Sequence, residues 1–481
     1  MISKIKPFLF FAILFFIIFA AACRKDKFLT DGASLEFSND TLTFDTVFRY
    51  AGSTTKQFRL YNNNKQPIKI SSVYLAGGES SPFRINLDGI SNVSFTDVEV
   101  PANDSLFIFV QVSVSPSQSN PLLIKDSVVF ETDGNTQNVK LVAIGQDVYL
   151  HKPDLPKIGV PYYSIMGREG KDTILPNDKP HLFFGYTVID SACKLTIPAG
   201  THLYFHNKAV LWVYKAGTLI VNGAYKNEVT FQGDRLESYY KDVAGQWGKI
   251  WFSKGSLNNR INWAIIKNGS IGVQADTVVT PSAPTVLLTN TIIKNMQAAA
   301  IYGLGARIWG TNCVFSNCGQ YIAAFTIGGS YRFEQCTFAN YWSDNVRTTP
   351  LLALNNYYTS ANNLYVIRNL DSAYFGNCIL MGDIDEEIGM DSSIYGGKFS
   401  YKFENCIIKT ARSVSNAHYK NVYNNADPSF KDIQSNDYHL NSSSAAIDKG
   451  YPNTLNLDLE NKARPNPAGT LPDLGAYEYY P

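Results

Sequence analysis

The sequence predicts an all-β protein, with an N-terminal Ig-like β-sandwich followed by a right-handed single-stranded parallel β-helix. Three observations support this prediction. Short alternating apolar runs between Gly, Asn, Asp and Pro dominate the chain, and no long amphipathic helical pattern is present. Residues 35–147 contain seven such runs, as a small sandwich requires. Residues 181–440 contain self-similar units of about 21 to 28 residues, a period typical of solenoids.

The first 23 residues predict a secretory signal. Lys4 and Lys6 precede a short apolar run over 7–20, and three alanines come directly before Cys23. The segment resembles a bacterial lipoprotein signal, although Ala20 stands where that family usually has Leu. The resemblance implies a lipid on Cys23 and a cell-envelope location, with the outer membrane as the expected site. An uncleaved anchor helix is the alternative, and the apolar run is short for a membrane span.

The polar residues 24–34 are expected to form a linker, and the sandwich follows over 35–147. The span has no cysteine, so no inter-sheet disulfide can form there. Its phrases YNNN, IKIS, VPANDSLFIFVQVSV and VVFETDG resemble the Ig-like domains of the abnormal-spindle and Hydin type. That resemblance implies a spacer role, with binding as the alternative, and no catalytic residue. The seven expected strands are 41–48, 56–62, 67–77, 94–100, 105–114, 126–132 and 137–145.

Residues 148–180 are assigned to a connector, and the repeats follow it. Two Ala-Gly-Thr turns occur at 199–201 and 216–218, and an Asn or Gln then recurs beside a cysteine. The separations between the equivalent positions are 27, 22, 23, 42 and 28 residues. We expect Asn356 to mark one more turn, which would divide the separation of 42. The equivalent positions are Trp263, Asn290, Asn312, Gln335, Asn377 and Asn405.

The period of two along a strand predicts the direction of each side chain in YKFENCIIKT (401–410). Phe403, Cys406 and Ile408 should point inward, and Ile407 outward, with a turn at Asn405. Stacked asparagines should hydrogen-bond from one coil to the next. The recurrent cysteines are therefore expected to pack in the core as free thiols, although stacked coils are close enough to allow a disulfide. These cysteines are Cys313, Cys336, Cys378 and Cys406.

The run from LTIPAGTHLYF through EVTFQGD resembles the right-handed parallel β-helix repeat proteins of the pectin-lyase-like superfamily. The stretches 427–450 and 458–480 resemble the closing segment of such exported proteins, which we assign to 441–481. The whole chain resembles a β-helix lipoprotein of the Bacteroidetes type. The resemblance covers most of the chain and implies the fold, while enzymes and binding proteins share this architecture.

No residue set in the sequence forms a recognisable metal site. Cys313 and Cys318 have no second pair at ligand spacing, and His202 and His206 should face outward from a strand. The acidic stretch 383–388 leaves Ca²⁺ open as an alternative to a solvated loop. We therefore expect no cofactor.

The long loop 231–247 interrupts the repeats and is the richest polar stretch. Its Asp234, Arg235 and Glu237 are weak catalytic candidates, and the alternative is an Asp234–Arg235 pair that anchors the loop. Trp251 and Trp309 are expected to face outward, where they could stack on sugar rings or cover a neighbouring loop.

The net charge of +1 gives no electrostatic case for nucleic acid. The sequence favours a lipid-anchored, non-catalytic envelope protein whose β-helix binds a ligand, with a polysaccharide as the expected partner. A polysaccharide lyase or glycoside hydrolase is the first alternative, because both use this fold. A purely structural envelope protein is the second.

Overall fold

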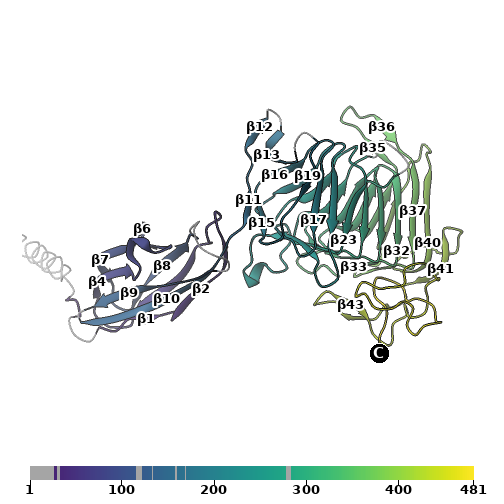
Figure 1. The fold of residues 1–481 in the computed structure, drawn as a ribbon. Helices are drawn as coiled ribbons and strands as arrows, with labels where there is room; N and C mark the ends of the chain where they lie inside the picture. Colours follow the sequence, from purple (N-terminus) through teal and green to yellow (C-terminus); the bar gives the residue numbers. More distant parts are fainter. Residues whose placement is uncertain are drawn as a thin grey trace, which may run out of the picture. The chain divides into compact units, whose positions relative to one another are not determined.

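The computed structural model describes residues 27–29, 33–114, 122–132, 134–157, 160–167, 170–277 and 283–481. The predicted signal segment and Cys23 lie outside these residues. The chain divides into two compact units, Met1–Asp147 and Val148–Pro481 (Figure 1). Within the described residues, no helix has both the length and the apolar character needed to cross a membrane.

The first unit is a β-sandwich of two five-stranded sheets, with strand orders β1-β3-β8-β5-β6 and β2-β10-β9-β4-β7. All seven predicted strands are present, and the structure adds β1, β5 and β6. Inward side chains alternate along the strands and share one core, which includes Phe44, Phe58, Phe83 and Phe130. The strands are β1 Glu36–Phe37, β2 Thr41–Phe48, β3 Lys56–Asn62, β4 Ile68–Leu75, β5 Phe83–Leu87, β6 Ile90–Asn92, β7 Ser94–Val100, β8 Asp104–Val112, β9 Leu122–Thr132 and β10 Asn135–Gln146.

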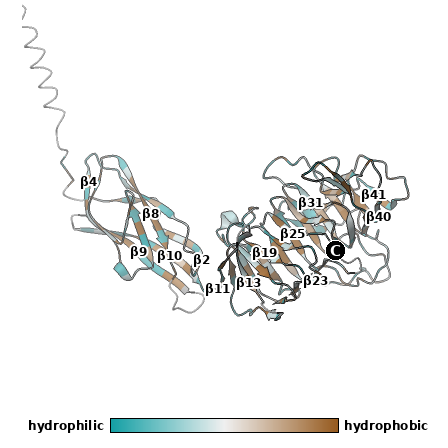
Figure 2. Ribbon diagram, turned by 90° about the horizontal axis from the view of Figure 1, so that it is seen from above, coloured by the Kyte–Doolittle hydropathy of each residue, from teal (hydrophilic) through white to brown (hydrophobic). Residues whose placement is uncertain are grey.

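The second unit is a parallel β-helix, as predicted, with three rows of parallel strands stacked coil on coil (Figure 1). Each coil passes through sheet 1, turns a corner into sheet 2, and continues into sheet 3. Sheets 1 and 2 share β40 (Phe399–Ile408) and β41 (Tyr419–Asn424). Apolar residues concentrate in the strands, as Figure 2 shows, because one face of each row lines a common interior.

The other strands fall into the three rows as follows. Sheet 1 holds β14 Thr173–Ile174, β17 Lys194–Pro198, β20 Thr218–Asn222, β23 Asn259–Asn262, β26 Val286–Thr289, β29 Arg307–Thr311, β32 Gly329–Glu334 and β37 Leu370–Gly376. Sheet 2 holds β11 Tyr149–His151, β15 His181–Phe183, β18 His202–Phe205, β21 Val229–Gly233, β24 Ala264–Lys267, β27 Ile292–Met296, β30 Val314–Cys318, β33 Thr337–Asn340 and β38 Ile379–Gly382. Sheet 3 holds β12 Leu155–Lys157, β13 Val160–Met166, β16 Tyr186–Ile189, β19 Val210–Val213, β22 Lys249–Phe252, β25 Ile271–Ala275, β28 Ala299–Leu304, β31 Tyr321–Thr326, β34 Leu352–Asn355 and β39 Ile388–Asp391.

The corner between sheets 1 and 2 is built from the recurring Asn and Gln positions. All six predicted corner residues have a positive φ of 48–58°, a conformation that Asn tolerates better than most residues. The predicted ladder is present where Asn312 donates to Asn290 at 2.7 Å and Asn290 donates to Asn262 at 3.0 Å. Trp263 adopts the same conformation at this corner.

Cysteines and aromatic rings stack inside the corner. Phe333, Phe375, Phe403 and Tyr419 form a continuous ladder with ring centroids 5.0–5.7 Å apart. The four recurrent cysteines are fully buried free thiols on consecutive coils. Burial raises the pKa of the Cys313 and Cys378 thiols, because the thiolate is poorly solvated there.

Two sequence assignments are corrected by the strand pairing. The segment 148–180 is no connector, because β11 pairs with β15 and β13 pairs with β16 in parallel, which makes it the first coil. Asn356 marks no extra turn, because β32 pairs directly with β37. The 42-residue separation is one coil enlarged by the hairpin of β35 (Tyr357–Thr359) and β36 (Tyr365–Ile367).

The last coil ends at β41, and residues 425–481, here called the C-terminal segment, run along the side of the β-helix. The segment therefore begins before the predicted boundary at 441, with the hairpin of β42 (Phe430–Asp432) and β43 (Asp437–Leu440). Its backbone meets the corner ladder, where Asn377 donates to the Tyr451 carbonyl at 2.8 Å. The buried Arg464 binds Glu478 at 3.1 Å and Asn312 at 3.2 Å.

Candidate functional site

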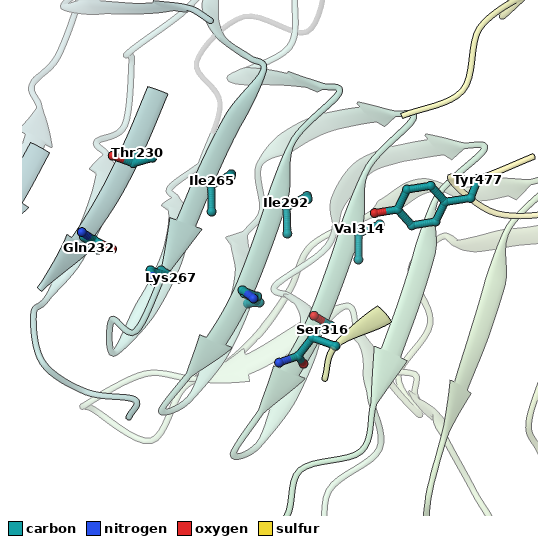
Figure 3. A pocket seen from close by; sticks show the side chains of 10 residues that line it. Thr230, Gln232, Ile265, Lys267, Ile292, Val314, Ser316 and Tyr477 are labelled. Carbon is teal, nitrogen blue, oxygen red and sulfur yellow. The ribbon is translucent and has the colours of Figure 1, made fainter. Parts of the chain in front are cut away.

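A groove lies on the outer face of sheet 2, with a volume of about 270 Å³ (Figure 3). Its floor consists of outward side chains from four consecutive strands, β21, β24, β27 and β30. The C-terminal segment supplies part of its wall through Asn436 and Tyr477. We call this feature the sheet 2 groove. Its floor residues are Thr230, Gln232, Ile265, Lys267, Ile292, Lys294, Val314 and Ser316.

The strand period of two arranges the floor in two rows across the strands. One row carries a hydroxyl group and then apolar groups, and its members are Thr230, Ile265, Ile292 and Val314. The other row is polar and contains Gln232, Lys267, Lys294 and Ser316. The groove can therefore offer apolar contact along one side of a ligand and charged hydrogen bonds along the other.

The two lysines of the polar row are half-buried. Burial lowers the pKa of both ammonium groups, and the neighbouring Lys294 lowers the pKa of Lys267 further, while Asp242 opposes these effects. Lys267 donates only a long hydrogen bond of 3.5 Å to the Lys241 carbonyl. Within the described part of the chain, no carboxylate forms an ion pair with either lysine. The floor thus concentrates positive charge that the protein leaves largely uncompensated.

Asparagines at the corner between sheets 2 and 3 hold the long loop and the C-terminal segment. Asn268, Asn295 and Asn317 have positive φ and follow Lys267, Lys294 and Ser316 in sequence. Asn268 donates to the Lys241 carbonyl at 2.9 Å, and Asn295 donates to Asp242 at 3.0 Å, which fixes the long loop beside this corner. Asn317 donates to Asn436 and so fixes the C-terminal segment.

The sequence candidates in the long loop are engaged in ion pairs. Asp234 pairs with His206 at 2.7 Å, and this bond raises the pKa of that histidine. Arg235 pairs with Glu237 at 3.0 Å and lies over the Tyr240 ring at 3.9 Å. The expected Asp234–Arg235 pair is therefore wrong. These pairs anchor the loop, and none of the three side chains lines the groove.

A smaller aromatic pocket of about 160 Å³ adjoins the groove and shares Ile265, Ile292 and Tyr477 with it. Tyr225 and Trp263 lie against each other there, with ring centroids 5.5 Å apart. Two carboxylates also line it. They belong to Glu228 on the β-helix and Glu460 on the C-terminal segment.

The other two sequence candidates lie on other faces. Trp251 is on sheet 3, where it stacks on Trp212 at 4.7 Å and donates to Asp276 at 2.8 Å. Trp309 is on the outer face of sheet 1 between Leu287 and Arg332. The fold does not bring either tryptophan to the groove.

The acidic stretch 383–388 is partly solvated and partly buried, with Asp383 and Asp385 exposed and Glu387 buried. Arg347 binds Asp383 and also the fully buried Glu387 at 2.6 Å, so two of the carboxylates are already neutralised. Across the described ranges, no group of three His, Cys, Asp or Glu residues is arranged to hold a metal ion.

Sequence analysis missed the two lysines, although a signal was present. The tetrapeptide IIKN occurs at 265–268 and again at 292–295, at the same register of the repeat. The apolar residues Val314, Ile379 and Ile407 also point outward at one repeat position. This pattern indicates a covering segment, and the C-terminal segment buries all three.

Comparisons with known proteins leave the family open. No family model matches the chain, and no curated protein matches it. Among solved structures, the chain is similar to the catalytic unit of a GH87 α-1,3-glucanase from Streptomyces thermodiastaticus, with 9% identity over 82% of this chain and 96% of that one, and a TM-score of 0.26. It is also similar to the Agl-KA catalytic domain, with 9% identity over 79% and 99% of the two chains and a TM-score of 0.25.

The chain is also similar to part of a family 123 glycoside hydrolase from Clostridium perfringens, with 8% identity and a TM-score of 0.18. That match covers 24% of this chain and only 28% of the hydrolase. TM-scores this low support no conclusion about function.

Proposed function

We propose that this protein binds an acidic polysaccharide in the sheet 2 groove. The observation that carries the proposal is the stacked pair of Lys267 and Lys294, which lie in register on adjacent strands and form no ion pair with any described carboxylate. Strand spacing places their backbones about 4.8 Å apart. A carboxylate or sulfate group between the two ammonium groups would offset their mutual repulsion and form charge-assisted hydrogen bonds.

The rest of the groove suits a sugar chain better than other polyanions. The apolar row through Ile265 and Ile292 can contact the C–H face of a sugar ring, while Gln232 and Thr230 can bind hydroxyl groups. Nucleic acid would require a broader basic surface than the net charge of +1 provides. The floor contains only two cations, so the charge fits a polymer with widely spaced anionic groups.

Anchoring to the envelope completes the proposal. The resemblance of residues 1–23 to a lipoprotein signal supports a lipid on Cys23 and a location at the outer membrane. The sandwich would then act as a spacer that carries the β-helix away from the membrane surface. Two acyl chains or more provide stable anchoring, at about 0.8 kcal/mol per buried CH₂.

A polysaccharide lyase is the second candidate. A neutral lysine with a lowered pKa can accept the α-proton of a uronate while its charged neighbour neutralises the carboxylate. A C4–C5 double bond would then form as the C4–O bond to the next sugar breaks, and the lysine ammonium would return the proton to the leaving oxygen. Binding without turnover remains our first proposal, because the weak catalytic candidates of the long loop are used in ion pairs.

A glycan array and a degradation screen with the purified full chain test both candidates. We expect binding to acidic glycans, and each Lys267→Ala or Lys294→Ala substitution should weaken it by about tenfold or more. Lys249→Ala is the matched control, because Lys249 is also half-buried with a lowered pKa but lies on sheet 3. Release of unsaturated products would replace the binding proposal with the lyase. Absence of binding to any acidic glycan would refute both.

A further inference from the structure

The outer face of sheet 2 is open on one side of β30 and covered on the other. Ile265, Lys267, Ile292 and Lys294 are partly exposed on β24 and β27. From β30 onward the outward residues are almost fully buried. They include Val314, Ser316, Thr337, Ala339, Ile379 and Ile407. The groove therefore stops where the C-terminal segment begins to cover the sheet.

Asn436 and Tyr477 of the C-terminal segment line the groove at this stop, and Tyr438 and His439 contact them from behind. Tyr438 is buried and donates to Asn317 at 3.1 Å, beside the bond between Asn317 and Asn436. Tyr477 stacks on His439 at 4.0 Å, and its hydroxyl end points toward Val314 at the end of the floor (Figure 3). His439 is held in turn by Glu460 at 3.3 Å.

The stop is joined firmly to the β-helix. Ala476, next to Tyr477, donates from its backbone to Thr337 at 3.0 Å, and Gly475 donates to the Asn377 carbonyl at 2.8 Å. At the other end of the apolar row His202 is exposed, so this row is open to solvent there, whereas the polar row continues at Tyr204, which is 9% exposed. The groove is thus open at one end and blocked at the other.

We infer that the groove receives the end of an acidic glycan chain and excludes chain interiors. A chain lying along the two rows passes the three open strands β21, β24 and β27, an extent of about 10 Å at the usual strand spacing, before it meets the covered residues of β30 beside Tyr477. An internal stretch would have to continue into the space that Tyr438 and Tyr477 occupy. This inference rests on the proposed function of the same groove.

Calorimetry of the full chain with a galacturonate polymer and its size-fractionated oligomers tests the inference. For end recognition, one protein binds per glycan chain, and the Kd per mole of chains stays within about twofold once the groove is filled. The number of sites per gram of glycan then falls as the chains lengthen. A constant number of sites per gram would overturn end recognition while leaving the proposed function intact. No binding at any length, combined with no binding to any other acidic glycan on the array, would overturn both.

A second measurement uses the stop itself. Tyr477→Ala should open the blocked end, so that the long polymer takes up more than one protein per chain. Tyr480→Ala is the matched control, because this exposed tyrosine of the same segment does not line the groove. If both variants keep one protein per chain, Tyr477 is not the stop. The length series on the unaltered chain decides the inference even if Tyr477→Ala fails to fold.

Discussion

Lys267 on β24 and Lys294 on β27 are direct register partners, and each precedes an asparagine with positive φ at the same corner. Their positions follow from the repeat, because both belong to an IIKN tetrapeptide. Asn295 at this corner binds Asp242 of the long loop. Tyr477 of the C-terminal segment lines the groove beside the same corner. Two lysines thus become part of the polar row of a groove that is open at one end.

As the pH is raised, binding of an acidic glycan should begin to weaken before the usual lysine pKa of 10.5 is reached, because burial lowers the pKa of both lysines. Only the charged ammonium attracts an anion, so binding is lost as the pH rises through the lowered pKa. The double variant Lys267→Arg/Lys294→Arg should retain binding to higher pH, since guanidinium stays charged. Calorimetric titrations at a series of pH values compare the two proteins. Identical pH profiles would contradict this role for the lysines.

The stability of the β-helix should fall on acidification because of a buried histidine pair. His151 and His181 are 2.9 Å apart, and His181 donates its other ring N–H to the Pro176 carbonyl, so His151 is the donor within the pair. Burial and the neighbouring His181 lower the pKa of His151 from 6.5 to about 3. The free energy of unfolding is therefore unaffected by this pair above pH 6.5 and falls as the pH drops toward 3, by on the order of 5 kcal/mol, because the unfolded state binds a proton that folded His151 does not.

Denaturant unfolding at several pH values measures this effect. His151→Gln should flatten the acid limb of the unfolding free energy. His206→Gln is a control of opposite sign, because Asp234 raises the pKa of His206 and that contribution is present at low pH. Equal acid limbs in the original protein and His151→Gln would show that the pair does not control the pH dependence.

The cysteine ladder should behave as packed free thiols. Cys336 lies between Cys313 and Cys378 on consecutive coils, fully buried. Cys336→Ser places a poorly paired hydroxyl there and should lower the free energy of unfolding by about 1–3 kcal/mol. Cys336→Ala, which buries no polar group, is the comparison.

A thiol count checks the redox state directly. The six cysteines of the described ranges should all react after unfolding without reductant, and react slowly in the native protein. A smaller count would mean that neighbouring coils are joined by disulfides.

Lipid attachment is tested by growth with a labelled fatty acid. The original chain should incorporate the label, and Cys23→Ser should not. Labelling of both proteins would rule out the predicted attachment at Cys23.

Local chemistry made much of the β-helix predictable. Asparagine tolerates a positive φ, so Asn290, Asn312 and Asn405 revealed the corner and the period. The same spacing argument misplaced Asn356, because an inserted hairpin lengthens one coil without adding another coil to the stack. Periodicity cannot distinguish an enlarged coil from two short ones.

The groove was less predictable, because distant parts of the chain build it. Asp234 and Arg235 stood out by composition, yet Asp234 pairs with His206 on the neighbouring coil and Arg235 pairs with the nearby Glu237. In the sequence, Lys267 and Lys294 look like other outward-facing lysines, because the groove around them also requires the distant Tyr477. The sequence contains no short-range signal for that docking beyond the outward apolar residues that the segment covers.

The position of the C-terminal segment also links binding competence to the completion of folding. The coils form contacts between neighbours in sequence, whereas Tyr477 reaches strands that precede it by a long stretch of chain. A folding intermediate with stacked coils and an undocked C-terminal segment would expose Ile379 and Ile407 as an aggregation-prone apolar strip. It would also lack the end of the groove that this segment forms. Ligand binding would therefore report that the whole chain, and not only its repeats, has reached the native state.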